Sequence, residues 1–149
     1  MKFFQIEEPD GSPADPNAPG VAIGVDLGGA QAEVAVAIGG NAAILHDREG
    51  FQRDLPVPAF NASNEAWQAV LEGARLRAER ALAQPVTHAV LAVISAPEPA
   101  LAARLSETAE AAGLTVLRIV GRDAIRAGET PALAAAVIAE DLAPRPAAD

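Results

Sequence analysis

The residues of this chain that could bind a charged group lie in a short turn after an apolar run. Asp26 ends the run 21–26, and Gly28 and Gly29 follow after Leu27. Glycine amides can approach an anion closely, and a neighbouring carboxylate can orient a metal-bound water. Asp26, Gly28 and Gly29 are therefore the candidate phosphate-binding residues. The alternative is an ordinary hairpin turn, with both glycines at positive φ and with Asp26 accepting turn amides. This alternative is favoured because the turn is not followed by a helix N-terminus or by a lysine.

Other chemistry-bearing residues are few. Arg122 and Asp123 follow a predicted strand, where they could form a new site, but adjacent opposite charges are usually solvated. His46 and His88 stand at predicted strand boundaries with no acid or second histidine at ligand spacing, so we expect both at the surface. The chain has no cysteine, which excludes disulfides and thiolate metal sites. We expect no catalytic residue and no metal site.

Composition narrows the classes of function further. The 149 residues suffice for one domain with its own core. A net charge of -9 argues against a nucleic-acid binder, whose affinity comes from clustered Lys and Arg. Lys2 is the only lysine, which removes Schiff-base chemistry and a phosphate-binding lysine. The sequence shows neither a membrane span nor a basic signal peptide, so we expect a cytoplasmic protein that does not bind membranes.

The chain divides into three parts. Residues 1–20 hold four prolines and read as an extended leader, in which the apolar stub 3–6 is a docking candidate. Residues 143–149 read as a disordered tail. The single folded domain is therefore predicted to span residues 21–142.

Within that domain the apolar period changes from two residues to three or four. Alternation predicts a meander of three antiparallel strands and a weaker extended piece. Helices and buried strands then alternate, which predicts parallel strands joined by a right-handed crossover. The expected order is strands at 21–26, 32–38 and 41–46, an extended piece at 52–57, a helix between Ser63 and Pro85, a strand at 89–94, a helix at 100–112, a strand at 115–120 and a helix at 131–142. This order describes an α/β domain with a mixed five-stranded sheet.

Three blocks of this sequence resemble a known family. Residues 23–29 followed by 33–36 resemble the first phosphate loop of the superfamily of actin, sugar kinases and heat-shock chaperones. The apolar strand at 89–93, a helix, and then residues 111–119 resemble the DnaK-type chaperones in order and spacing. Residues 4–9 resemble the leader of HscA, the DnaK relative of iron–sulfur cluster assembly, and the turn at 47–50 has a counterpart in the family. The resemblance implies a ribonuclease-H-like fold, matching the first lobe of the nucleotide-binding domain.

The departures from the family concern catalysis. The family's segment with a catalytic lysine is missing between Gly50 and Asn64. Residues 29–32 are Gly-Ala-Gln-Ala where the family has Thr-Thr-Asn-Ser, so two hydroxyls are lost. Arg122 stands where the family has a catalytic glutamate, and the second lobe and the peptide-binding domain have no counterpart. Phosphoryl transfer needs cations, a metal and a positioned water, so we expect no useful ATP hydrolysis and no resident cofactor.

Two hypotheses and a residual one follow. The first is a degenerate HscA/DnaK-like domain that acts through protein contact, in iron–sulfur assembly or chaperone regulation. The second is a small ATP-binding chaperone that keeps the phosphate loop with MgATP at Asp26, Gly28 and Gly29. The third is a gene remnant without function.

Two surfaces are candidates for protein contact. The alanine-rich stripe 132–139 would be exposed if the missing lobe normally covered it, whereas the alternative, which we favour, is that this helix folds back on the domain's own sheet. The charged residues of the helix after Ser63 form a solvated face with i,i+3 and i,i+4 pairs, or they receive an acidic partner. They are Glu72, Arg75, Arg77, Glu79 and Arg80.

Overall fold

A computed structural model describes residues 20–46, 54–59 and 61–144 of the chain. The leader residues 1–19, the turn 47–50, Phe60 and the tail 145–149 lie outside the described residues, so the expectations for them are not addressed by it. No described helix is long and apolar enough to cross a bilayer.

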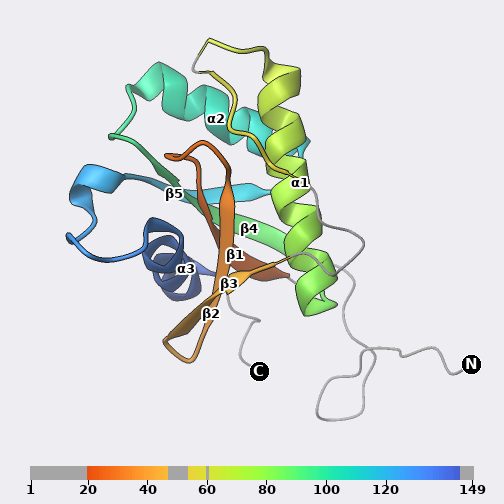
Figure 1. Ribbon diagram of the computed structural model, residues 1–149. Coiled ribbons are helices and arrows are strands. Elements are labelled where there is room, and N and C mark those ends of the chain that lie inside the picture. The colour runs from red at the N-terminus through yellow and green to blue at the C-terminus, as the bar shows by residue number, and fades with distance from the viewer. Residues whose placement is uncertain (1–19, 47–53, 60, 145–149) are drawn as a thin grey trace, which may run out of the picture.

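The core of the molecule is one mixed sheet of five strands (Figure 1). The order across the sheet is β3-β2-β1-β4-β5, with β1 antiparallel to β2 and parallel to β4. Strands β2 and β3 are antiparallel, and strands β4 and β5 are parallel. The strands are β1 (Val21–Asp26), β2 (Glu33–Ile38), β3 (Asn41–Leu45), β4 (Val86–Val93) and β5 (Thr115–Gly121). This is the expected α/β fold, and it is consistent with a ribonuclease-H-like fold.

Three helices and one short 3-10 turn complete the part of the chain that the structure describes, and residues typical of helix ends flank them. The Ser63 hydroxyl accepts a hydrogen bond from the Ala66 amide at 3.2 Å and begins the first helix. Pro131 occupies the first turn of the last helix, where an amide donor is not needed. The elements are α1 (Asn64–Leu82), α2 (Pro99–Ala111), the 3-10 turn η1 (Arg122–Ala124) and α3 (Pro131–Leu142).

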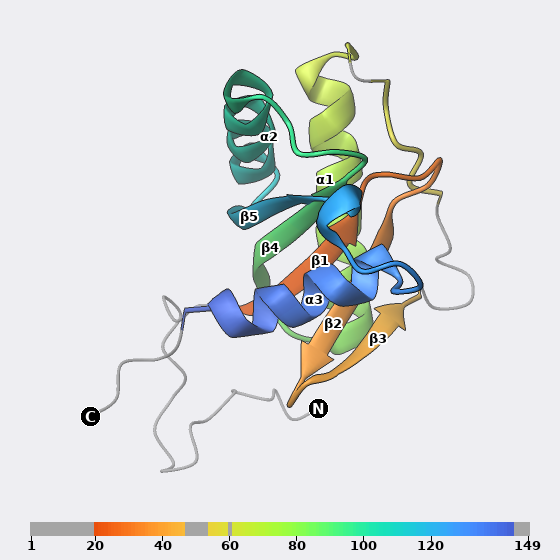
Figure 2. The same ribbon diagram turned by 90° about the vertical axis from the view of Figure 1, so that its left-hand side faces the viewer.

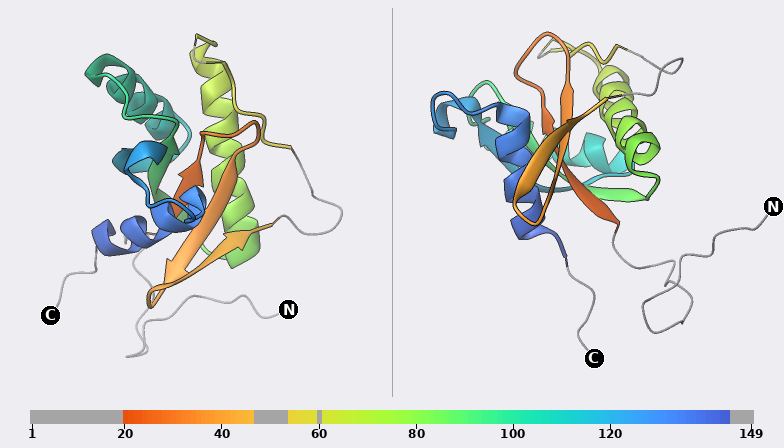
Figure 3. Two further views of the ribbon diagram at one scale, coloured as in Figure 1. Left: turned by 60° about the vertical axis from the view of Figure 1, so that its left-hand side comes forward. Right: turned by 60° about the horizontal axis from the view of Figure 1, so that its bottom comes forward.

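The helices cover opposite faces of the sheet. Figure 2 shows α1 and α2 side by side, and the views in Figure 3 show the strands between α1 and α3. The side chains of β1 alternate between these two faces. Ile23 and Val25 join the core beneath α1 and α2, while Ala22 packs with α3. The sheet is therefore buried on both faces along its central strands.

The face beneath α3 is packed so closely that backbone meets backbone. A Cβ placed on Gly24 would lie 2.3 Å from the Ala136 nitrogen and 2.7 Å from the Ala132 oxygen. The small side chains of Ala132, Ala135, Ala136 and Ala139 are fully buried in this contact. The last helix thus folds back on its own sheet, as favoured, and the alternative of an exposed alanine stripe at 132–139 is wrong.

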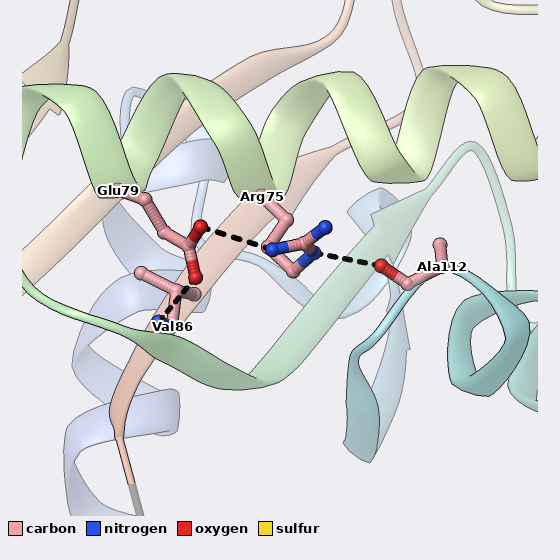
Figure 4. Close-up of polar contacts among 4 residues, drawn as sticks. All are labelled: Arg75, Glu79, Val86 and Ala112. Carbon is pink, nitrogen blue, oxygen red and sulfur yellow. Dashed lines mark hydrogen bonds and ion pairs between the residues drawn. The ribbon is translucent and has the colours of Figure 1, made fainter.

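The opposite helix, α1, is fixed by a polar contact drawn in Figure 4. Arg75 donates through Nε to the Ala112 carbonyl at 2.8 Å and through Nη1 to Glu79 Oε1 at 2.9 Å. Glu79 also accepts the amide of Val86, the first residue of β4, at 3.0 Å. The predicted i,i+4 pairing on this helix face is confirmed for Arg75 and Glu79. Their side chains are half-buried rather than fully solvated, and they tie α1 to the end of α2 and the start of β4.

The turn between β2 and β3 has the expected hairpin chemistry. Gly39 and Gly40 have φ of 60° and 83°, which favours glycine at both positions. Glu140 of α3 accepts both of their amides, at 2.6 Å from Gly39 and 2.9 Å from Gly40. The last helix therefore also holds the hairpin in place.

Candidate functional site

Asp26 lies at the carboxyl end of β1, where the chain turns toward β2. Its side chain is only 1% exposed. The Gly28 amide donates to Asp26 Oδ1 at 2.9 Å, and the Leu27 amide continues the pairing with β4 by donating to the Ala92 carbonyl at 2.7 Å. The expectation that Asp26 accepts a turn amide is confirmed.

Arg122 reaches this loop from the carboxyl end of β5. Because β1, β4 and β5 are parallel, their carboxyl ends meet at one edge of the sheet, and residues 96 positions apart in sequence become neighbours. Arg122 donates through Nη2 to Asp26 Oδ2 at 2.5 Å and through Nε to Oδ1 at 3.3 Å. The expectation of a solvated Arg122 is therefore wrong, whereas Asp123 beside it is exposed.

The electrostatics of this pair favour the charged form of Arg122. The hydrogen bond to Asp26 raises the pKa of Arg122, and the nearby charges of Asp26 and Glu33 raise it further, against a smaller lowering by burial. Charge-assisted bonds of this two-point kind are stronger than neutral ones. The buried carboxylate thus has a permanent cation as its partner.

The Arg122 side chain occupies the space beside Gly28. A Cβ at this position would come within 2.6 Å of Arg122 Nε and 2.8 Å of its Cδ, whereas a Cβ on Gly29 would meet nothing closer than 3.7 Å. The described glycines with positive φ are Gly39, Gly40, Gly113 and Gly128. The expectation of positive φ at Gly28 and Gly29 is therefore wrong.

The contacts of Asp26 determine what the loop can do chemically. One carboxylate oxygen accepts the Gly28 amide and Arg122 Nε, and the other accepts Arg122 Nη2. An aspartate that orients a metal-bound water needs an oxygen directed at the water. With both oxygens bonded to the protein, the loop is arranged to hold the ends of β1 and β5 together.

A cleft opens beside this loop, at the carboxyl ends of β1 and β4. We call it the strand-end cleft; it has a volume of about 780 Å³. Its walls come from the turn after β1, the segment before α1, the start of α1, the loop after β4 and the start of α2. Its lining residues are Leu27, Gly28, Gly29, Val57, Pro58, Trp67, Val93, Ile94, Ser95, Ala96, Pro97, Glu98, Leu101 and Leu105.

The two histidines lie apart from this edge of the sheet. His46 follows β3 and is exposed, as expected. His88 is half-buried in β4, which corrects the expectation of a surface residue, and its Nδ1 lies 2.7 Å from the Thr87 hydroxyl. Burial lowers the pKa of His88. Neither histidine touches the strand-end loop in the contacts of the described residues.

Sequence reasoning placed Asp26, Gly28 and Gly29 together but missed their partner. Arg122 follows the last strand of a parallel pair, and an acid ends the first strand, so the topology itself could have indicated the ion pair. Trp67 falls on the apolar period of the helix predicted after Ser63, and this pattern indicates only a core residue. Its place in the cleft wall depends on the segment before α1, for which the sequence has no strong pattern.

Comparisons with known proteins give no family assignment: no protein-family model matches the chain, and no curated protein matches it.

Proposed function

We propose that this chain is a shortened, catalytically degenerate relative of the DnaK/HscA-type chaperones, which does not hydrolyse ATP and acts by protein contact. Two features support the kinship: the sheet order β3-β2-β1-β4-β5, and the order of the resembling sequence blocks along β1, β4 and β5. Fold alone does not determine function, so the proposed loss of catalysis rests on the site.

The observation that carries the proposal is the ion pair between Arg122 and Asp26. In a phosphate loop the aspartate acts on a metal-bound water, and the metal neutralises phosphate charge. Here the Arg122 guanidinium is the cation bound to the carboxylate, at 2.5 Å, and its side chain presses against Gly28. A phosphate group approaching the loop would have to displace a partner of a buried acid.

Contact with another protein is proposed for the β2–β3 hairpin end of the domain. Ile38 is 68% exposed at the end of β2. Val137 of α3 is also exposed and lies one turn from Glu140, which bonds the Gly39 and Gly40 amides next to Ile38. Exposed large apolar side chains near the hairpin are the surface features on which the proposed contact rests. We call Ile38 and Val137 the hairpin patch.

The proposed partner is a component of the iron–sulfur assembly or chaperone machinery, as the resemblance implies. Affinity capture of the protein from the cells that naturally express it, followed by identification of the co-eluting proteins, tests the identity of this partner. We expect assembly or chaperone components with the wild type and with Ile94→Asp, and their loss with Ile38→Asp. Equal capture by both variants, or no enrichment of such components, contradicts the proposed contact.

The proposed loss of catalysis is tested by a turnover assay with MgATP. We expect phosphate release no faster than in buffer, from the wild type and from Arg122→Ala alike, because the lysine and the hydroxyls are also missing. Metal-dependent release above background by the purified wild type overturns this part of the proposal and favours the ATP-binding chaperone.

A further inference from the structure

We propose that the strand-end cleft binds an uncharged, largely apolar small molecule that carries a hydrogen-bond acceptor. This inference goes beyond the proposed function and does not depend on it, because the cleft walls and the hairpin patch share no residue.

The position of the cleft favours a ligand site. In open α/β sheets ligands bind outside the carboxyl ends of the strands, at the point where the chain order in the sheet reverses. Here β1 continues to β2 on one side, while the later strand β4 flanks it on the other. The cleft lies at the carboxyl ends of this pair, between the loops that follow β1 and β4.

The size and lining of the cleft indicate an apolar ligand of moderate size. Its volume of about 780 Å³ is in the range of small-molecule sites, roughly 300–1,000 Å³. Leucine, valine and proline side chains and Trp67 make up most of the wall, and Ile94 at its edge is 71% exposed. A largely exposed isoleucine beside a cleft of this kind is stabilised when a ligand covers it.

The charges around the cleft exclude an anionic ligand. Glu98 is the charged residue among those that line it, and no lysine or arginine is in the set. Arg122 lies against Gly28, which lines the cleft, but its guanidinium is bonded to Asp26. A phosphate or carboxylate would therefore enter next to Glu98 without a cation to balance it.

Trp67 specifies the acceptor. The residue lines the cleft and is 7% exposed, and its Nε1 is buried with no hydrogen-bond partner among the described residues. An indole N–H can only donate, and buried donors in native proteins almost always have an acceptor. We infer that the acceptor comes with the ligand, after an adjustment of the indole ring that uncovers Nε1.

Trp67 also makes the cleft directly observable, since it is the only tryptophan and the chain has no tyrosine. The probe is Prodan, an uncharged dimethylaminonaphthalene that carries a ketone, and the control probe is its sulfonate analogue. We expect saturable Prodan binding that quenches Trp67 emission in step with the rise in probe fluorescence. No saturation below about 100 μM, about -5.5 kcal/mol, or equal binding of the sulfonate, overturns the proposal.

Two exposed isoleucines provide a matched pair of variants. Ile94→Asp places a carboxylate at the edge of the cleft, and Ile38→Asp makes the same change on the distant hairpin. We expect Ile94→Asp to weaken Prodan binding about tenfold, or about 1.4 kcal/mol, and Ile38→Asp to leave it within twofold. Equal effects of the two variants overturn the cleft as the site. The variants act in the opposite order on protein capture, so the two proposals can fail separately.

A third variant tests the acceptor. Trp67→Phe removes the donor but keeps an aromatic wall, and circular dichroism shows whether the variant is folded. We expect Prodan binding to weaken about fivefold, while N-phenylnaphthylamine, which has no carbonyl, binds as before. If the folded variant binds both probes as the wild type does, the inferred role of the indole is wrong.

Discussion

The two faces of the sheet are packed in different ways. Beneath α3, alanines and Gly24 let helix and strand backbones approach until there is no space for one more carbon. Beneath α1 and α2, larger side chains fill the core, but the layer opens at the carboxyl ends of β1 and β4 into the strand-end cleft. The closed face keeps the shape of the domain, and the open end of the other face leaves room for a ligand.

Adding one methyl group to a glycine on each side should show the difference in packing most clearly. Gly24→Ala places a Cβ against the α3 backbone, which must move, so we expect a loss of at least about 3 kcal/mol in the free energy of unfolding or failure to fold. Gly29→Ala makes the same change at the edge of the cleft, where space is free, and should stay within about 0.5 kcal/mol. Urea denaturation measures both. Equal losses would mean that the two faces are packed alike.

The strand-end ion pair is expected to give the next largest effect. Arg122→Ala leaves Asp26 buried without its cation, and we expect a loss of about 2 kcal/mol, less than for a fully buried pair because the Arg122 side chain is 37% exposed. Asp26→Asn combined with Arg122→Ala should lose less than the two single variants together, because no unpaired charge remains. Strict additivity in urea denaturation would show that the pair is not coupled.

A smaller effect is expected for the polar contact beneath α1. Glu79→Ala removes the acceptor of the Val86 amide and a partner of Arg75, which should cost about 1–2 kcal/mol. Glu72→Ala, an exposed glutamate on the same helix, is the control and should change stability by less than about 0.5 kcal/mol. If thermal unfolding shows the same change for both, the contact does not hold α1 to β4.

The smallest effect concerns pH. Burial lowers the pKa of His88 in the folded state, so the unfolded chain, with the ordinary value of 6.5, binds the proton more readily. This contribution to stability is therefore complete above about pH 6.5 and declines as the pH falls toward the lowered folded value. In His88→Gln, the urea midpoint should change less between neutral and mildly acidic pH than it does in the wild type. An unchanged pH profile in the variant contradicts the assignment to His88.

Local patterns explain why most of the fold could be predicted. The boundaries of β1 and α3 agree with the predicted ones, because Gly28 with Gly29 and Thr130 with Pro131 are strong local signals. The strand predicted at 89–94 instead begins at Val86. Its first residues are fixed by the Glu79 carboxylate, a tertiary contact that periodicity cannot reveal.

The site was predictable only in part, for a similar reason. Asp26 and Gly28 lie two residues apart, so their turn could be recognised, but the side chain that fills the space beside Gly28 comes from 94 positions later. The alanine stripe of α3 shows the same limit: its burial depends on Gly24 of a distant strand. Long-range contacts of this kind need the topology before individual residues can be paired.

We propose above all that Arg122 is the cation bound to Asp26, where a phosphate loop would have a metal ion and a phosphate group. Isothermal titration calorimetry of the folded wild type with MgATP tests it most directly. The account predicts no binding stronger than a Kd of about 1 mM. Submillimolar binding of MgATP that is lost on Gly28→Ala would contradict it, because the nucleotide would then occupy the loop that Arg122 is proposed to close.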